Sequence, residues 1–383
     1  MSRSLIYLVA GARPNFMKIA PIVRALQAHG GLEYKIIHTG QHYDREMNDV
    51  FFEELGIPAP DVFMGAGGGS HARQTAKIMT AFEELCEAGK PDAVLVVGDV
   101  NSTLACSIVA KKLHIPVAHV EAGLRSGDLS MPEEINRLVT DSISDWFFVT
   151  EPSGVAHLRR EGKPDSAIRH VGHVMVDNLL YQAAKLAQTG GEFETSGFKR
   201  RHARYGVVTL HRPSNVDDPD MMARIGGALT DIAADLPLIF PVHPRTRANL
   251  ARFGVDLGPN VELLGRVDDA QLDRLYAECA ALVLPTRFEG MPTVVLEAMA
   301  RARPIIVSDV GATAELVSPH NGYLIPPGDA EQLYNAVVAF TSRSPEVREK
   351  MGAYSYARVK EVFSWPVVAQ RFVKLFEEVA AKR

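Results

Sequence analysis

The chain has 383 residues, of which 46% are hydrophobic and 23% are charged, so it can form two domains with complete hydrophobic cores. This composition is ordinary for a globular protein. Its formal net charge of −5 at pH 7 gives no reason to expect a nucleic-acid partner, because such binding depends on basic surfaces.

The cysteines and the N-terminal segment indicate the compartment. Cys86, Cys106 and Cys279 are odd in number and lack CxxC spacing, so we expect buried, unpaired thiols and neither a disulfide nor a zinc framework. The first apolar run is too short for a membrane-spanning helix, and no small-residue cleavage site follows it. The sequence therefore predicts a cytoplasmic protein without membrane insertion.

Short apolar runs alternate with helical patterns along the whole chain, which is typical of parallel βαβ units. The predicted strands of the first half are 5–11, 34–40, 93–99, 116–122 and 146–150. Those of the second half are 205–211, 238–243, 261–265, 281–286, 304–309 and the short run YLIPPGD. Because these runs are apolar without alternation, we predict an α/β protein with two Rossmann-like, doubly wound domains.

The alternation weakens between the two halves, where a fading helix precedes a connector rich in Gly, Thr, Lys and Arg. We predict an N-terminal domain over 1–178, a linker over 179–204 and a C-terminal domain over 205–362. A final amphipathic helix over 363–383 is expected to pack back on the N-terminal domain. The carboxyl ends of the strands in both domains would face a central cleft, where such folds bind ligands.

Polar side chains follow several predicted strands directly. Because carboxyl ends of parallel strands meet at one edge, we expect these side chains to converge on one crevice. They are Arg13, Gln41, His42, Asp99, Glu121 and His211.

The first strand-to-helix turn reads GARPNFMKIAP, with Arg13 and with Pro14 at the expected helix start. The unpaired N–H groups of a helix N-terminus suit an anion, although a plain βα turn is the alternative. The turn is neither GxGxxG nor a Walker motif, so we expect no nicotinamide or other cofactor.

Carboxylates stand at the ends of two buried strands and at the start of a helix. Asp99 ends VVGD, with a helix N-cap as its alternative role. Glu121 follows an apolar strand, and a buried carboxylate without a function is costly unless it is paired. Glu133 and Arg137 are four residues apart, so a surface ion pair is their alternative. Together these acids favour general acid/base chemistry, and no pair has metal-ligand spacing.

Six segments in this order resemble the non-hydrolysing UDP-N-acetylglucosamine 2-epimerases: GARPNFMKIAP, TGQHYDREM, VVGDVNSTLA, HVEAGLRSGD, PEEINR and TLHRPSNVD. The resemblance runs from about residue 5 to about residue 260. It implies a GT-B fold of two Rossmann-like domains, with a UDP-sugar in the cleft, and a homodimer, which is usual for this family.

The resemblance also implies a reaction. UDP-GlcNAc and UDP-ManNAc would interconvert by loss of the C2 proton with anti elimination of UDP, followed by re-addition of UDP to 2-acetamidoglucal. It assigns catalysis to Asp99, Glu121, Glu133 and His211. It assigns substrate binding in this part of the chain to Arg13, Lys18, Gln41, His42, Arg125 and Arg137.

Residues from about 261 to about 365 resemble a different family, the retaining GT-B glycosyltransferases with an E-x7-E motif. The motif stands in RFEGMPTVVLEAM, as Glu289 and Glu297. This resemblance implies that the N–H groups of Gly290 and Met291 face the diphosphate, that Glu297 binds the ribose and that Glu289 contacts the sugar. A surface helix carboxylate is the alternative for Glu297. The change of resemblance predicts a chimera of two related families.

Three functions follow from these observations. The intact set of acids favours a UDP-GlcNAc 2-epimerase. The E-x7-E segment indicates a retaining UDP-sugar glycosyltransferase, but LHRPSNVDDPD lacks the expected basic Lys. A catalytically silent UDP-sugar binder would result if the halves were misaligned. The expected ligands are UDP-GlcNAc, UDP-ManNAc or UDP.

Overall fold

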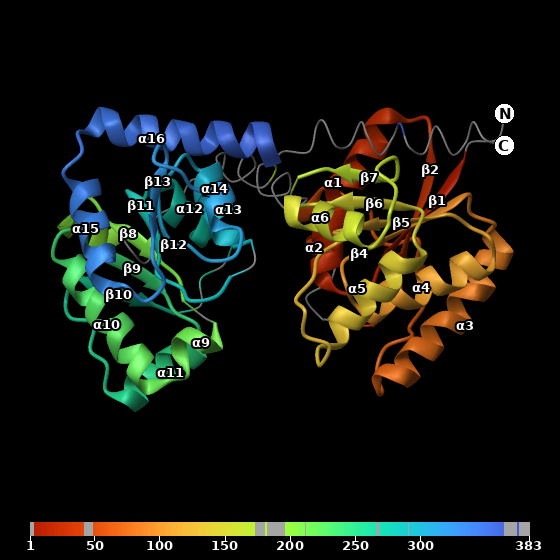
Figure 1. Cartoon of the computed structure of the whole chain (residues 1–383), viewed down its shortest axis with the longest axis horizontal. Helices are drawn as coiled ribbons and strands as arrows, with labels where there is room; N and C mark the ends of the chain where they lie inside the picture. Colours follow the sequence, from red (N-terminus) through yellow and green to blue (C-terminus); the bar gives the residue numbers. More distant parts are fainter. Residues whose placement is uncertain are drawn as a thin grey trace. The chain divides into compact units, whose positions relative to one another are not determined.

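The computed structural model divides into two compact units (Figure 1). Unit 1 comprises Met1–Asn178 with Phe363–Arg383, and unit 2 comprises Leu179–Val362. The structure describes residues 4–41, 49–172, 181, 196–210, 212–265, 267, 269–289, 291–363 and 374. Three predicted site residues, His42, His211 and Gly290, lie outside the described residues, as does most of the predicted C-terminal helix.

Unit 1 contains a seven-stranded sheet in the order β3-β2-β1-β4-β5-β6-β7, and every strand pairing is parallel. The strands are β1 Leu5–Ala10, β2 Glu33–His38, β3 Val62–Phe63, β4 Ala93–Val97, β5 Val117–Val120, β6 Trp146–Val149 and β7 Ile168–His170. The helices are α1 Arg13–His29, α2 Asp49–Leu55, α3 His71–Gly89, α4 Asn101–Lys112, α5 Pro132–Ile143 and α6 Pro152–Arg160.

Each face of this sheet has its own core, because successive strand side chains point to opposite sides. Leu8 on β1 and Leu95 on β4 pack with Phe16 of α1 on one face. Val9 on β1 packs with Phe82 of α3 on the other. The strands are therefore apolar at nearly every position, which is the pattern that a doubly wound sheet requires.

Unit 2 contains a six-stranded parallel sheet in the order β10-β9-β8-β11-β12-β13. The strands are β8 Gly206–Val208, β9 Leu238–Pro241, β10 Val261–Leu264, β11 Ala281–Leu284, β12 Ile305–Ser308 and β13 Gly322–Ile325. The helices are α8 Ser196–Arg201, α9 Pro213–Val216, α10 Pro219–Ala233, α11 Pro244–Phe253, α12 Asp269–Glu278, α13 Thr293–Ala300, α14 Thr313–Leu316, α15 Ala330–Thr341 and α16 Pro345–Arg358, with a π-helical turn over Val359–Phe363.

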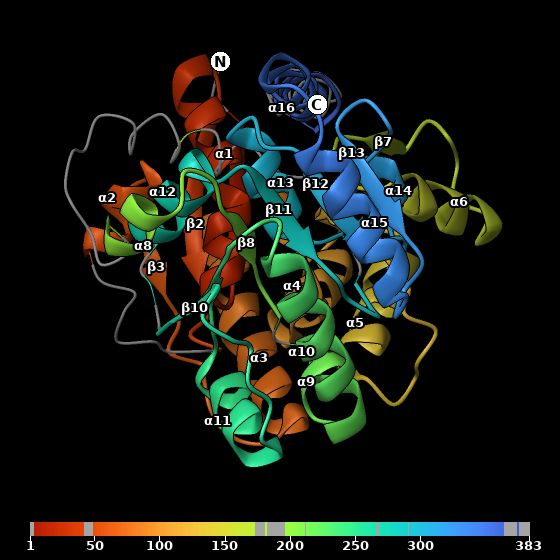
Figure 2. The same cartoon turned by 90° about the vertical axis from the view of Figure 1, so that its left-hand side faces the viewer.

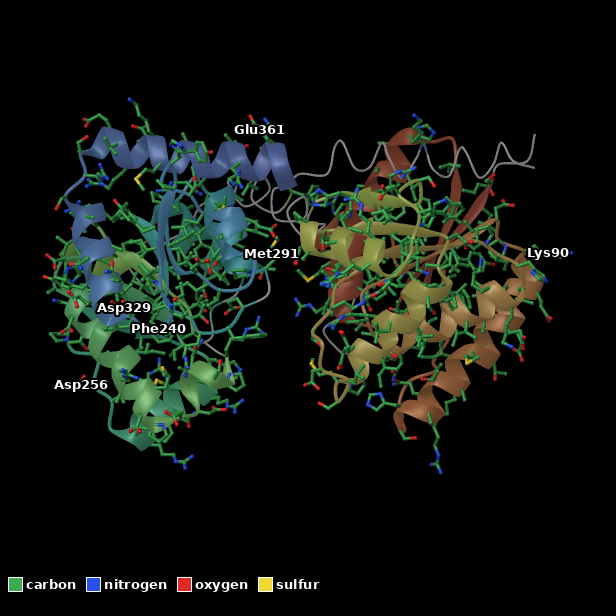
Figure 3. All side chains as sticks on the ribbon, viewed as in Figure 1. Lys90, Phe240, Asp256, Met291, Asp329 and Glu361 are labelled. Atoms are coloured by element: carbon green, nitrogen blue, oxygen red, sulfur yellow. The ribbon has the colours of Figure 1, made fainter. Side chains whose placement is uncertain are left out.

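Helices α10 and α15 pack together on one face of the sheet (Figure 2). Phe240 on β9 is buried, whereas Asp256 is exposed (Figure 3).

The predicted α/β class with parallel sheets is confirmed, but some predicted elements differ from the observed ones. Strands β3 and β7 were not predicted, because they have only two and three residues. Strand β8 ends at Val208, so the predicted strand over 205–211 is too long. Helix α8 lies inside the segment 179–204 that was predicted to be a linker.

The three cysteines are buried and unpaired, as predicted. Burial raises the pKa of the Cys86 thiol to about 12. In the part of the chain that the structure describes, no helix is both long and apolar enough to cross a membrane.

The turn between β1 and α1 packs closely against the N-terminus of α4. A Cβ atom on Gly11 would lie 2.3 Å from Ser102 Oγ and 3.2 Å from Thr39 Oγ1. The turn that carries Arg13 therefore has room only for glycine at this position.

We predict that Gly11→Ala lowers the free energy of unfolding of unit 1 by about 1–3 kcal/mol, because the added methyl group overpacks the turn. Thermal unfolding followed by circular dichroism measures the change. Gly227→Ala is the matched control, because Gly227 lies in α10, where an added Cβ atom would meet no neighbouring side chain within 4 Å. It should stabilise unit 2 by about 0.5–1 kcal/mol. An unchanged midpoint for Gly11→Ala would show that the turn can expand.

Candidate active site

The candidate site lies at the carboxyl edge of the unit 1 sheet. Strands β1, β4 and β5 are consecutive neighbours in that sheet. Arg13, Asp99 and Glu121 follow them directly, so the three side chains start from one edge. The helix after β1 packs on one face of the sheet and the helix after β4 on the other, which is the switch point where doubly wound sheets bind ligands.

Glu121 has an unusual backbone and a cationic partner. Its φ of 67° is in the left-handed region that favours glycine, and such a conformation costs about 1–3 kcal/mol. Its Oε2 atom lies 2.5 Å from Lys18 Nζ, and the two side chains are 10% and 19% exposed. A Cβ atom on Gly98 would lie 3.5 Å from the same carboxylate oxygen. The end of β4, the end of β5 and helix α1 therefore converge at this ion pair.

Asp99 is paired with Arg137. The Nη2 and Nε atoms of Arg137 lie 2.5 and 3.0 Å from Asp99 Oδ2. Asn136 Nδ2 donates to the Asp99 carbonyl oxygen at 2.8 Å. The N-cap of α4 is Val100, so the alternative role of Asp99 as a helix cap is wrong.

Helix α5 carries two adjacent glutamates with different surroundings. Glu134 is buried and accepts hydrogen bonds from the N–H groups of Ser126 and Gly127, and it pairs with Arg137 Nη1 at 2.8 Å. Glu133 is half-buried, and its side chain makes no ion pair or hydrogen bond within the described residues. Arg137 thus pairs with Glu134, and the alternative surface pair of Glu133 with Arg137 is wrong.

Arg13 is the first residue of α1 and directly follows a turn that is fixed by hydrogen bonds. The Oδ1 atom of Asn15 accepts hydrogen bonds from the N–H groups of Gly11 and Ala12, both at 3.0 Å. The Arg13 guanidinium lies over the Phe51 ring, 5.3 Å from its centre. The sequence did not single out Asn15, although a polar residue at the third position of a helix often binds the preceding turn.

Gln41 is buried and joins β2 to the N-terminus of α4. Its Oε1 atom accepts hydrogen bonds from Ser102 N at 2.8 Å and from Ser102 Oγ at 2.7 Å. Thr39 Oγ1 lies 2.7 Å from the same hydroxyl group. The predicted residue therefore joins the segment after β2 to α4 through its own hydrogen bonds.

Buried charged groups contact the backbone beside Asp99 and Glu121. His119 and Asp141 have fully buried side chains, and their Nδ1 and Oδ1 atoms are 2.7 Å apart. His119 Nε2 lies 2.8 Å from the carbonyl oxygen of Gly98, and Gly123 N donates to Asp141 Oδ2 at 2.9 Å. Neither His119 nor Asp141 was singled out from the sequence. A single polar residue inside the apolar run VAHV is the signal that could have identified His119.

Arg125 connects these buried groups to the surface. Its Nη1 atom lies 2.7 Å from Asp141 Oδ2, and its Nε and Nη2 atoms donate to the two carboxylate oxygens of Glu161 at 2.9 and 2.8 Å. Every guanidinium nitrogen of Arg125 therefore contacts a protein oxygen, and its predicted contact with substrate stays a prediction.

Burial and charge act in opposite directions on these groups. Burial lowers the pKa of His119, but Asp141 and the Gly98 carbonyl together raise it by more than burial lowers it. The pKa of His119 therefore lies above 6.5. Burial raises the pKa of Asp141, but His119, Arg125 and the Gly123 N–H together lower it by more than burial raises it. The pKa of Asp141 therefore lies below 3.8. Opposite shifts of this kind are expected for a charged pair.

The described site residues of unit 2 lie in the loop before α13 and in α13 itself. Glu289 is buried and accepts from Arg212 Nη2 at 2.8 Å and from Thr286 Oγ1 at 3.2 Å. Met291 lies just before α13 (Figure 3), and Glu297 lies within this helix, half-buried. Burial raises the pKa of Tyr276, and the negative charge of the nearby Glu297 carboxylate raises it more. One oxygen of this carboxylate is itself buried, so Glu297 is not simply a surface group.

A comparison with known protein families identifies the family of this chain. The family model described as UDP-N-acetylglucosamine 2-epimerase matches residues 24–374. The chain belongs to the UDP-N-acetylglucosamine 2-epimerase family. The match continues through 261–365, so it does not confirm the separate, transferase-like origin that the sequence predicted for that segment.

Individual proteins support the family assignment. A Pseudomonas aeruginosa UDP-2,3-diacetamido-2,3-dideoxy-D-glucuronate 2-epimerase is 41% identical over 255 residues, which cover 66% of this chain and 70% of that protein. The crystal structure of Methanocaldococcus jannaschii UDP-GlcNAc 2-epimerase in complex with UDP-GlcNAc and UDP is 32% identical, with a TM-score of 0.65 and coverage of 93% and 98%. The sucrose-phosphate synthase of Thermosynechococcus elongatus, 19% identical with a TM-score of 0.69 and full coverage of both chains, shares the fold alone. The predicted GT-B type of fold is confirmed.

We predict that the stability of unit 1 of this epimerase-family chain decreases as the pH rises from about 6.5, the ordinary pKa of histidine. The pKa of His119 is higher in the folded state than in the unfolded state, so binding of this proton stabilises the fold. This contribution to stability is complete below pH 6.5 and is lost as the pH rises through the pKa of the folded state. The groups facing the imidazole are Asp141, Glu121 and the Gly98 carbonyl. Thermal midpoints at pH 6, 7.5 and 9 should fall more steeply for the wild type than for His119→Gln. Equal pH dependence in both proteins would disprove the assignment.

Proposed function

We propose that this chain interconverts UDP-GlcNAc and UDP-ManNAc without a cofactor. The observation that carries the proposal is the pair of carboxylates Glu121 and Asp99, each with its own cation, at the carboxyl edge of one sheet. The structure of the M. jannaschii relative with UDP-GlcNAc and UDP supports the choice of substrate. The family assignment favours this reaction over the glycosyltransferase that the sequence left open.

The chemistry requires proton transfer at both faces of C2. In the first step a carboxylate accepts the C2 proton, the C1–O bond breaks with its electrons leaving on UDP, and a C1–C2 double bond forms. In the second step the UDP oxygen attacks C1 while a carboxylic acid delivers a proton to the other face of C2. One carboxylate gains a proton and the other loses one, and exchange with solvent restores both. The reaction therefore needs at least two carboxyl groups.

We assign these transfers to Asp99, Glu121 and Glu133. Lys18 and Arg137 hold two of the carboxylates in fixed positions, which supports proton transfer over short distances. Glu133 is unpaired within the described residues and is available to the sugar. Arg125 and Arg137 contact protein carboxylates, so we assign them to holding these groups in place.

The departing diphosphate carries negative charge that the protein has to stabilise. We assign this role to Arg13 at the N-terminus of α1, together with His211, which lies outside the described residues. Lys18 and Gln41 belong to the same edge of the sheet. We assign substrate binding to His42, as the resemblance implies. His42 also lies outside the described residues.

We assign UDP binding to the loop and helix around Met291 and Glu297 in unit 2. The N-terminus of α13 offers N–H groups for a phosphate, and Glu297 offers a carboxylate for ribose hydroxyl groups. The bond from Arg212 fixes Glu289 within the loop, which supports a role in shaping the site. The homodimer and the cytoplasmic location stay predictions, and light scattering of the purified protein tests the first.

We predict that wild-type protein in heavy water incorporates deuterium at C2 of UDP-GlcNAc and forms UDP-ManNAc, as followed by proton NMR. Glu121→Gln and Asp99→Asn should each lower kcat by about 10²–10⁴-fold, because an amide cannot exchange the C2 proton. Glu83→Gln on the exposed part of α3 is the control and should keep full activity. UDP signals that broaden without any turnover would favour the silent binder.

We predict that Glu297→Gln raises KM for UDP-GlcNAc roughly tenfold with kcat nearly unchanged, because one charge-assisted hydrogen bond to the ribose is weakened. Glu349→Gln on α16 removes the same charge from an exposed position and should leave both constants unchanged. Titration with UDP by calorimetry checks the affinity directly. Equal UDP affinity of wild type and Glu297→Gln would remove Glu297 from the site.

A second substrate has specific support. The relative from P. aeruginosa, named for UDP-2,3-diacetamido-2,3-dideoxy-D-glucuronate, is 41% identical to this chain. The same carboxyl groups would act at C2 of that sugar. The heavy-water experiment run on both nucleotide sugars distinguishes them by kcat/KM.

A further inference from the structure

The buried His119 faces two acceptors. Its Nε2 atom lies 2.8 Å from the Gly98 carbonyl oxygen, and its Nδ1 atom lies 2.7 Å from Asp141 Oδ1. A carbonyl oxygen only accepts, and Asp141 is surrounded by the donors Gly123 N and Arg125 Nη1, which favour its ionised form. A neutral imidazole has a single N–H, so the two hydrogen bonds together require an imidazolium ion.

This ion ties together the two segments that carry the carboxylates. Gly98 immediately precedes Asp99, and its φ of 71° belongs to a turn that glycine adopts without strain. Gly98 N donates to the Val120 carbonyl oxygen at 3.0 Å, next to Glu121. On the other side, Asp141 accepts from the N–H of Gly123, two residues after Glu121. The ends of β4 and β5 are thus joined through one imidazole and one carboxylate.

We propose that His119, held as an imidazolium by Asp141, is a positioning residue that fixes the Gly98–Asp99 turn relative to Glu121. The side chain is fully buried, so it contacts no substrate and acts through the backbone that it binds. This inference rests on the proposed function. A displacement of about 1 Å at a reacting group can cost roughly 100-fold in rate, so the loss of one such anchor reduces turnover.

Two amide variants separate positioning from a merely structural role. The Nε2 atom of Gln occupies nearly the place of imidazole Nε2 and can donate to the Gly98 carbonyl. The Nδ2 atom of Asn occupies nearly the place of imidazole Nδ1 and can donate only to Asp141. Both variants are similarly neutral and similarly buried, so each serves as the control for the other.

The proposal expects His119→Asn to lower kcat for UDP-GlcNAc about 100-fold with little change in KM. His119→Gln should keep kcat within about tenfold of the wild type, because it retains the hydrogen bond to Gly98. Deuterium incorporation at C2 is the readout, at protein concentrations corrected for the folded fraction from thermal melts. Equal or higher activity of the Asn variant than of the Gln variant would overturn the proposal.

A measurement on the wild type covers the case in which neither variant folds. The ¹⁵N shifts of the His119 ring should show two protonated nitrogens at pH 7 and above the pH at which an ordinary histidine titrates. One unprotonated ring nitrogen at pH 7 would overturn the proposal. If the wild type does not epimerise UDP-GlcNAc, the proposed function fails and the catalytic consequence fails with it, whereas the ring shifts still decide whether the imidazolium exists.

Discussion

The arrangement of unit 1 depends on keeping two carboxylates beside two cations at the edge of a sheet. Partly buried carboxylates are costly unless they are paired, and here the pairs are Lys18 with Glu121 and Arg137 with Asp99. Lys18 comes from the helix after β1 and Glu121 from the end of β5, so the first pair spans the end of β4 between them. The strand order β1-β4-β5 brings these groups together.

Helix α5 supplies the other half of the arrangement. Glu134, Arg137 and Asp141 are spaced three and four residues apart, so they project from one face of the helix. That face binds the loop after β5 through Glu134, the end of β4 through Arg137 and the buried histidine through Asp141. Glu133 lies about 100° around the helix from Glu134, and its different neighbours follow from that rotation.

Much of this arrangement could be predicted from the sequence, and the rest depends on tertiary contacts. The acids at strand ends were predictable because buried parallel strands are continuous apolar runs and their ends share one edge. The partners of Arg137 were not, since a long side chain can reach several acids and only the fold places Asp99 within its reach. The role of His119 was hidden because its partners Gly98 and Asp141 are 21 and 22 residues away. Strand β3 was missed because two residues carry no periodicity.

The strained backbone at Glu121 is maintained by hydrogen bonds and by an ion pair. A left-handed φ at a glutamate persists only where surrounding contacts enforce it. Here the N–H of Glu121 donates to the Phe148 carbonyl, and the following Gly123 N–H is held by Asp141. The conformation turns the chain sharply at the strand end, while Lys18 holds the carboxylate from the adjacent helix. A glycine at this position would relieve the strain but would carry no carboxylate. The strain therefore results from an acidic residue at a turn whose backbone conformation favours glycine.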